Sequence, residues 1–268
     1  MILIHPTAII EPSVKLGKNV EIGPYCTLTG NVVLADNVAL KSHVVVTGNT
    51  VVGNNTIIYP FASIGHAPQD LKYQGEDSTL VIGNNNIIRE HVTINPGTSG
   101  GGLRTSIGNN CLFMVSSHVA HDCVIGNNVI LANNVTLGGH VTIHDNAIIG
   151  GMSAVHQFVR IGEHVMIGGM SGIEHDVMPF ALVKGERASI VGINMIGLKR
   201  RGFEKNEINA LRDAYDILFY SNTKHFFELI KEIHNKYVSN PAIQKLVEFL
   251  MDKSSRGICK PKTNNDSE

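Results

Sequence analysis

The sequence predicts a solenoid of short parallel strands, a β-helix, followed by a small helical domain. Three observations carry this prediction. Large aliphatic residues recur at every sixth position, small or β-branched residues follow them four positions later, and beyond Pro179 the apolar residues fall at helical spacing instead. A period of six fits neither a helix face nor an alternating strand, but it suits a chain that turns a corner once in every repeat.

The aliphatic series begins at Ile4 and reaches Ile173 with two interruptions. The first tract is Ile4, Ile10, Leu16, Ile22, Leu28, Leu34, Leu40, Val46, Val52, Ile58 and Ile64. The series resumes at Ile82, Ile88 and Ile94, and then runs unbroken from Ile107 to Ile173. Three six-residue repeats would close one triangular coil of 18 residues, and each coil would cover the core of the next.

The position four residues after each aliphatic is small or β-branched. Cys26, Cys111 and Cys123 share this phase, so we expect them to be small interior residues. The four cysteines form no CxxC pair, which argues against a zinc ribbon or a redox motif. Gly often stands directly after the aliphatic residue, and Asn is common two residues later. Because both tolerate left-handed backbone conformations, each repeat is expected to be a short strand plus a corner.

Two segments interrupt the repeat, near 66–81 and near 97–106. Loops excluded from a regular solenoid usually line its binding face, so we expect both to reach a ligand. The second segment is rich in glycine, as in loops that cradle phosphate, although the GK[ST] signature of a P-loop is missing.

The last part of the chain is expected to be helical. Three helices are predicted, at 204–220, 223–237 and 240–253. Asn240 followed by Pro is a helix start signal, and the polar tail from Ser254 is expected to fray. We therefore divide the chain into a β-helix at 1–190 and an α-helical domain at 191–268.

Charge balance and the distribution of apolar residues argue against nucleic-acid binding and against a membrane span. Lys and Arg number 22 against 23 Asp and Glu, so the charge balance gives no support for nucleic-acid binding. No apolar run approaches the roughly 18 residues of a membrane span, and the N-terminus lacks the basic and apolar regions of a signal peptide. We expect a cytosolic protein.

The predicted coil gathers polar residues along one edge, because residues 18 apart lie on the same side of adjacent coils. The cluster comprises His118, His121, Asp122, Gly139, His140, His156 and Gln157. Two chemistries fit it. Three histidines could hold zinc, as in β-helical carbonic anhydrases, or one imidazole oriented by a carboxylate could act as general base for a hydroxyl that attacks an acyl thioester.

Longer strings in the sequence favour the second chemistry. They are QDLKY at 69–73, HVAHDC at 118–123, LANN at 131–134, GH at 139–140, IGGMSAVHQF at 149–158 and GLKRRGF at 197–203. In this order they resemble the UDP-N-acetylglucosamine acyltransferases over nearly the whole chain. This family belongs to the left-handed β-helix acyltransferases and performs the first step of lipid A biosynthesis.

The resemblance implies a reaction and its partners. A 3-hydroxyacyl group would move from acyl carrier protein to the 3-hydroxyl of UDP-N-acetylglucosamine. The donor would bring its own phosphopantetheine, and no other cofactor and no metal is expected. The family's sites lie between the subunits of a homotrimer, and its coils wind to the left.

The resemblance also assigns roles to individual residues. His121 would remove the hydroxyl proton, Asp122 would orient its ring, and the backbone N–H of Gly139 would receive the developing oxyanion. The substrate-binding set would be Gln69, Asp70, Lys72, His118, His140, His156, Gln157, Asn194, Arg200 and Arg201. Gly169 matches the position that limits acyl length, where glycine leaves room for a longer chain.

Some positions depart from the family pattern, and some alternatives stay open. Asn95-Pro96 replaces a His-Arg pair, and Ile196 replaces an acidic residue, which bears on the nucleotide contacts. By themselves, Lys72 reads as a solvated loop charge, and the KRR run at 199–201 as either a solvated face or a phosphate or acidic-protein site.

Other β-helix proteins fit less well. A coenzyme A-dependent acetyltransferase fits the fold but lacks the HVAHDC and GLKRRGF strings. A related N-acylating enzyme carries an additional N-terminal domain, for which a repeat beginning at Ile4 leaves no room. An ice-binding solenoid would need a flat threonine face. The acyl length and a 3-amino sugar acceptor are both left open by the sequence.

Overall fold

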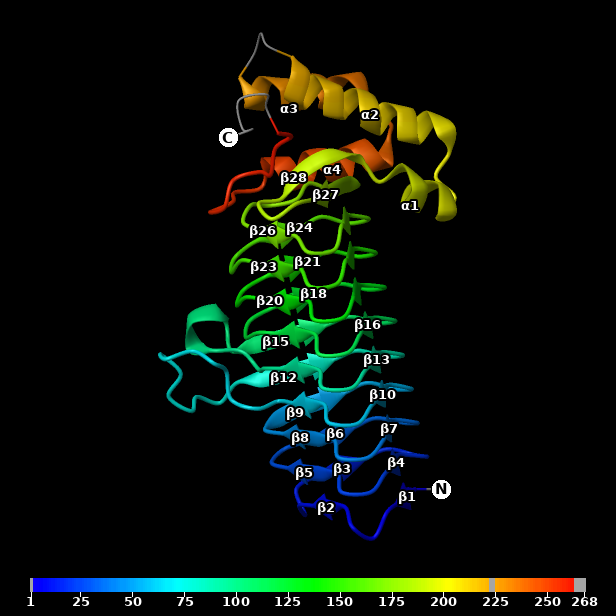
Figure 1. Ribbon diagram of the computed structural model, residues 1–268, viewed down its shortest axis with the longest axis vertical. Helices are drawn as coiled ribbons and strands as arrows, with labels where there is room; N and C mark the ends of the chain where they lie inside the picture. Colours follow the sequence, from blue (N-terminus) through cyan, green and yellow to red (C-terminus); the bar gives the residue numbers. More distant parts are fainter. Residues whose placement is uncertain (1, 222–224, 263–268) are drawn as a thin grey trace.

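The computed structural model describes residues 2–221 and 225–262, and its main body is a left-handed parallel β-helix (Figure 1). Triangular coils stack along one axis, helices cover one end of the stack, and two loops project from its side. Most strands are only two residues long, because each side of a coil holds one inward aliphatic residue and its neighbour before the next corner.

Three sheets form the three sides of the coil. Sheet A contains β1 (Leu3–Ile4), β4 (Glu21–Ile22), β7 (Ala39–Leu40), β10 (Ile57–Ile58), β13 (Ile87–Ile88), β16 (Leu112–Phe113), β19 (Ile130–Leu131), β22 (Ile148–Ile149), β25 (Met166–Ile167), β27 (Ala181–Lys184) and β28 (Ser189–Ile193). Sheet B contains β2 (Ile9–Ile10), β5 (Thr27–Thr29), β8 (Val45–Thr47), β11 (Ser63–Ile64), β14 (Thr93–Ile94), β17 (His118–Val119), β20 (Thr136–Leu137), β23 (Ala154–Val155) and β26 (Gly172–Ile173). Sheet C contains β3 (Lys15–Leu16), β6 (Val33–Leu34), β9 (Asn49–Val52), β12 (Thr79–Ile82), β15 (Arg104–Ile107), β18 (Val124–Ile125), β21 (Thr142–Ile143) and β24 (Arg160–Ile161). We name the corners by the sheets they join: A–B, B–C and C–A.

The stacking register survives both interruptions of the repeat. At the C–A corner, Asn109 and Asn127 stack with a sequence separation of 18. The same contact joins Asn54 to Asn84 and Asn84 to Asn109 across separations of 30 and 25. The extra residues leave the coil at the B–C corner, as the loops 66–78 and 97–103, and the second loop contains a short 3-10 helix, η1 (Ser99–Gly101). Both predicted loops are therefore present, on the same corner of adjacent coils.

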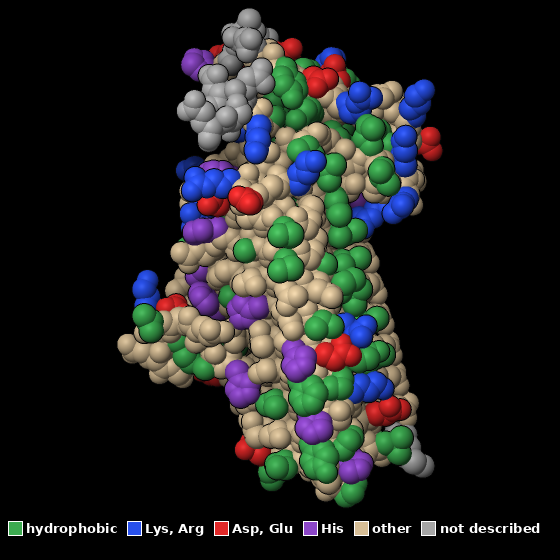
Figure 2. All heavy atoms as spheres, viewed as in Figure 1, with side chains coloured by type: hydrophobic (Ala, Val, Ile, Leu, Met, Phe, Trp, Pro, Cys, Tyr) green, Lys and Arg blue, Asp and Glu red, His purple; other side chains and the backbone are tan. Residues whose placement is uncertain are grey.

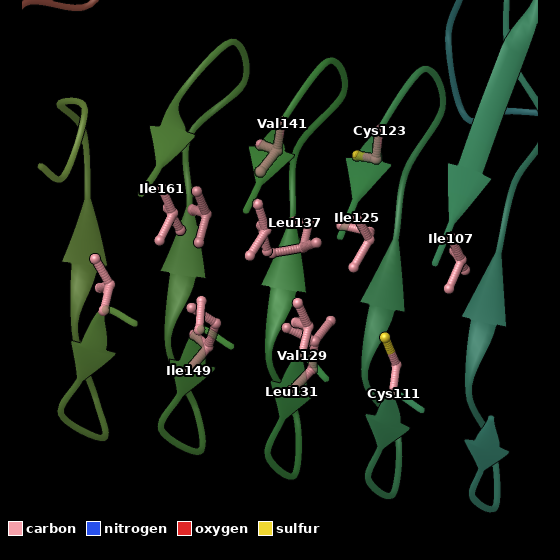
Figure 3. Packing of buried hydrophobic residues seen from close by; sticks show 14 of the residues in the cluster. Ile107, Cys111, Cys123, Ile125, Val129, Leu131, Leu137, Val141, Ile149 and Ile161 are labelled. Carbon is pink, nitrogen blue, oxygen red and sulfur yellow. The ribbon is translucent and has the colours of Figure 1, made fainter. Parts of the chain in front are cut away.

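The repeated aliphatic residues fill the interior of the coil (Figure 3). Cys26, Cys111 and Cys123 are buried among them as free thiols, so their predicted interior role is confirmed. The N-terminal end is different, because among the described residues no other coil lies on its outer side: Ile4 is 47% exposed. The burial expected for every sixth residue therefore begins only with the second coil.

The C-terminal end contains elements that the periodicity did not predict. An antiparallel pair, β27 with β28, closes sheet A, and the division predicted at residue 190 falls within β28. The helices are α1 (Met195–Arg200), α2 (Lys205–Tyr220), α3 (Phe226–Lys236) and α4 (Pro241–Met251). The last three match the predicted helices, although the start expected at 223 lies outside the described residues, whereas α1 was not predicted.

The segment after α4 packs back on the β-helix as far as Lys260, whose carbonyl accepts from the backbone N–H of Ile190. Ile258 pairs with Asp176, and Cys259 is buried. The predicted fraying from Ser254 is therefore wrong for this segment, while 263–268 lies outside the described residues. Arg160 links the β-helix to the end of α4, since its guanidinium lies 2.7 Å from the carboxylates of both Asp176 and Asp252. None of the helices in the described ranges has the length and apolar character of a bilayer span.

Candidate active site

A histidine and an aspartate form a dyad at the B–C corner, between β17 and β18. His121 Nδ1 lies 2.8 Å from Asp122 Oδ2, and the side chain of Asp122 is fully buried. A carboxylate can only accept here, so it holds the proton on Nδ1 and leaves the lone pair of Nε2 available. His121 keeps 14% of its side chain exposed. The dyad therefore presents the lone pair of Nε2 at the surface.

Gly139 lies directly against the His121 ring, one coil further along the same corner. A Cβ atom at position 139 would stand 2.5 Å from Cε1 and 2.6 Å from Nε2 of His121. Real Cβ contacts are not this short, so only glycine allows the ring and the backbone to approach in this way. The pairing of His121 with Gly139 that the 18-residue coil predicted is confirmed.

Two further imidazoles surround the dyad and are held neutral by burial. His140 meets His121 edge-on with ring centroids 5.0 Å apart and stacks on Phe158. His118 Nδ1 lies 2.7 Å from Thr93 Oγ1. Desolvation lowers the pKa of both His118 and His140, so near neutral pH they offer hydrogen bonds rather than charge. Figure 2 shows histidines gathered beside the projecting loops.

The same cluster bears on the zinc alternative. Donor atoms of His121, Asp122 and His140 lie within 4.8 Å of one another, the single such group of three in the described part of the chain. It consists of two imidazoles and a carboxylate rather than the three histidines that the carbonic anhydrase interpretation requires.

The glycine-rich loop closes over Asp122. Thr98 donates to the carboxylate twice, from its backbone N–H to Oδ1 at 2.9 Å and from its hydroxyl to Oδ2 at 2.6 Å. The backbone N–H of Asp122 in turn donates to Thr105 Oγ1. A Cβ at Gly101 would stand 2.0 Å from Asp122 Cγ, so the loop fits only with glycine there. The loop therefore cradles a carboxylate of its own chain instead of a phosphate.

The first loop lies next to the second. Asp70 is close enough to His140 for its charge to act on that ring, while Lys72 is exposed, with its backbone N–H bonded to Asp70. Glu76 accepts from the backbone N–H of Ser99 at 2.9 Å, and such backbone contacts lower the pKa of Glu76 to about 2. The two loops are thus joined by an ionised carboxylate.

The start of the first loop contains the exposed Gln69 and is held by the buried Asn95. Gln69 is exposed. Asn95 is buried and donates to the carbonyl of His66, which fixes the point where this loop leaves the coil. The departure from the family pattern at Asn95 thus falls on a residue that holds the chain itself.

His156 and Gln157 lie on the same corner, one coil beyond Gly139, and both are exposed. The carbonyl of Gln157 accepts from Arg256 Nε at 2.8 Å, so this coil contacts the C-terminal segment. The structure therefore aligns these residues with the dyad without bringing either side chain onto His121.

The remaining predicted residues lie on other corners. Gly169 is at the A–B corner. Asn194 caps α1 and donates to the carbonyl of His164 at the C–A corner, where Arg201 donates to His164 Nδ1 at 3.0 Å. Burial, with the Arg201 charge nearby, lowers the pKa of His164 to about 4. Arg200 and Ile196 are exposed. Within one chain, these residues do not meet the dyad.

Thr98, Gly101 and Glu76 were not predicted as site residues. The one signal for them in the sequence was the glycine run of the second loop, which indicated close backbone approach but not its object.

A β-helix of six-residue repeats that presents a histidine–aspartate dyad at one corner defines a hexapeptide-repeat transferase. The family model "Udp N-acetylglucosamine O-acyltransferase; Domain 2" matches residues 176–259, and the bacterial transferase hexapeptide model matches 104–139. The acyl-[acyl-carrier-protein]–UDP-N-acetylglucosamine O-acyltransferase of Paracoccus denitrificans is 47% identical over 205 residues, which are 76% of this chain and 77% of that protein.

Solved structures agree over the full length. LpxA from Acinetobacter baumannii superposes with a TM-score of 0.93 at 45% identity, covering 96% of this chain and all of that one. The UDP-N-acetylglucosamine acyltransferase of Francisella novicida gives 0.91 at 38% identity, over 100% of this chain and 96% of that one. The chain belongs to the acyl-[acyl-carrier-protein]–UDP-N-acetylglucosamine O-acyltransferase family.

Proposed function

We propose that this protein transfers a 3-hydroxyacyl group from acyl carrier protein to the 3-hydroxyl of UDP-N-acetylglucosamine, the first step of lipid A biosynthesis. The observation that carries the proposal is the dyad, in which Asp122 leaves Nε2 of His121 unprotonated beside Gly139. This geometry suits the removal of a proton from a hydroxyl nucleophile. The names of the relatives supply the donor and the acceptor.

The reaction follows from the positions of these groups. His121 Nε2 takes the proton from the sugar hydroxyl as its oxygen attacks the thioester carbonyl, and Asp122 stabilises the imidazolium that forms. The backbone N–H of Gly139 would donate to the oxyanion, a contact typically worth about 3 kcal/mol in the transition state. The proton then passes to the departing thiolate of the phosphopantetheine. No cofactor of the protein's own enters these steps.

The binding residues divide into two groups, and we propose that a homotrimer brings them together. His118 and His140 lie beside the dyad, His156 and Gln157 follow on the same corner, and Gln69, Asp70 and Lys72 belong to the first loop, which leaves that corner. Gly169, Asn194, Arg200 and Arg201 lie on other corners, so they would serve the dyad of a neighbouring copy.

Exposed apolar residues at the A–B corner support this assembly. Tyr25 and Phe61 on N-terminal coils, and Met152 and Met170 on C-terminal coils, are each more than half exposed there. Exposed apolar residues of this kind suit contact with another subunit. We also propose that the protein is located in the cytoplasm, as the sequence predicts.

The test is an acyl-transfer assay with UDP-N-acetylglucosamine and a panel of 3-hydroxyacyl carrier proteins of different chain length. We expect one chain length to be preferred, and the glycine at position 169 favours a long chain. Metal analysis of the same preparation addresses the carbonic anhydrase alternative. Stoichiometric zinc together with no acyl transfer would reject the proposed function.

A further inference from the structure

The contact between the glycine-rich loop and Asp122 lies outside the steps of the proposed reaction. Resting on the proposed function, we propose that Thr98 is a positioning residue, which fixes the Asp122 carboxylate and thereby sets how readily His121 accepts a proton. Thr98 itself touches neither the His121 ring nor the space beside Gly139 by any contact in the structure, so its action would pass through Asp122.

The first support is the hydrogen bonding of the carboxylate. Asp122 Oδ2 is shared between His121 Nδ1 at 2.8 Å and the Thr98 hydroxyl at 2.6 Å, while Oδ1 accepts the backbone N–H of Thr98. Thr98 is 3% exposed and Asp122 is 6% exposed, so water does not compete for these bonds. Charge-assisted bonds of this kind in a buried site are both directional and strong.

The second support is the way in which the loop is held. Gly101 passes so close to Asp122 that no Cβ fits between them, and Glu76 of the first loop accepts the backbone N–H of Ser99, next to Thr98. Thr98 is therefore held in place by the contact of Gly101 with Asp122 and by the hydrogen bond from Ser99 to Glu76. Since the first loop also carries Asp70 and Lys72, the proposed sugar-nucleotide ligands, the dyad is connected to that binding loop through Thr98.

The electrostatic consequence has a definite sign. The Thr98 hydroxyl draws negative charge from the same oxygen that faces His121, so its removal would make Asp122 a better partner for the imidazolium. The other titratable groups beside the dyad are His118 from β17 and His140 from the next coil, and Asp70 of the first loop acts on His140. All three stay in place when Thr98 changes. Loss of the hydroxyl should therefore move the acid limb of activity to higher pH.

The experiment compares Thr98→Val and Thr98→Ser with the wild type across a pH series. Because the Asp122 carboxylate is then no longer fixed and orients His121 less well, we expect Thr98→Val to lower kcat roughly 10- to 100-fold. We also expect it to move the acid limb of kcat/KM upward by roughly 0.5 to 1 pH unit, with a smaller change in KM for the sugar nucleotide. Thr98→Ser keeps the hydroxyl and should restore both values.

A matched control is Thr50→Val. Thr50 is also fully buried, in β9 next to the B–C corner, but its hydroxyl donates to the carbonyl of Thr47 and contacts no part of the dyad. Its kcat and pH profile should remain those of the wild type. If Thr98→Val does not fold, as judged by circular dichroism, Thr98→Ala takes its place.

A second readout requires no substrate. The rate at which diethyl pyrocarbonate modifies His121, followed by mass spectrometry as a function of pH, should show the same upward shift in Thr98→Val. An unchanged profile, with or without a lower kcat, would mean that Thr98 only supports the loop and would overturn the inference. If the wild type transferred no acyl group but the modification profile still shifted, the proposed function would fail and the role of Thr98 would stand.

Discussion

Substitution of Gly139 by alanine tests the geometry of the dyad most directly. The added Cβ would stand 2.5 Å from His121 Cε1 and 2.6 Å from Nε2, whereas ordinary carbon contacts begin near 3.5 Å. The ring must therefore retreat by about 1 Å. Gly139 does not occupy the left-handed region of φ, so alanine is compatible with its backbone and the coil should still form.

The size of the effect follows from this displacement. A shift of about 1 Å stretches the 2.8 Å contact between His121 and Asp122 beyond hydrogen-bonding distance and moves Nε2 away from the acceptor hydroxyl. A misplacement of about 1 Å at a reacting centre can cost roughly 100-fold in rate. We therefore expect Gly139→Ala to lower kcat roughly 100-fold with little change in the stability of the β-helix.

The assay measures initial rates of acyl transfer with saturating donor while UDP-N-acetylglucosamine is varied, and urea unfolding monitors the fold. Gly100→Ala is the control, because a Cβ there meets its nearest atom, Thr98 Oγ1, at an ordinary 3.8 Å. A Gly139→Ala enzyme with kcat within twofold of the wild type would refute the placement of Gly139 against the base.

Three further predictions concern His121, the buried ion pair between Asp176 and Arg160, and His164. His121→Ala should lower acyl transfer by roughly 100- to 10,000-fold in a folded protein; near-normal turnover measured in the same assay would reject His121 as the base. Asp176→Ala removes the buried partner of Arg160 and should lower the free energy of unfolding by about 3 to 5 kcal/mol, and an unchanged urea midpoint would contradict this. Because burial lowers the pKa of His164 to about 4, the unfolded chain binds this proton first, so the stability that His164 contributes is complete above about pH 6.5 and falls as the pH drops toward 4. His164→Gln should make the urea midpoint fall less steeply over that range, and equal slopes would refute the prediction.

The β-helix could be predicted because every repeat makes the same local choice. An aliphatic residue that is not covered by neighbouring coils has no reason to recur at every sixth position, so the periodicity by itself required stacking. What periodicity cannot supply is the end of the stack. Ile4 obeys the pattern and is still exposed, and the hairpin of β27 and β28 closes the other end without any repeat of its own.

The candidate site was predictable to the extent that it follows the 18-residue coil. His121 and Gly139 are one coil apart with no insertion between them, and the structure places them in contact. Arg201 shows the limit of this approach. Its position on a different corner is fixed by α1 and by His164, neither of which has any periodic relation to the dyad.

The interruptions of the repeat make the dyad different from the other corners. A regular corner buries a small residue and leaves polar groups facing water, which would let Asp122 be solvated and His121 rotate. The extra residues at 97–103 place Thr98 on the carboxylate, and those at 66–78 hold that loop through Glu76. The uninterrupted coils on the C-terminal side supply Gly139 and His140 at fixed spacing. The regular repeat and its two interruptions, which meet at one corner, are therefore both needed to hold the His121 imidazole against a buried carboxylate.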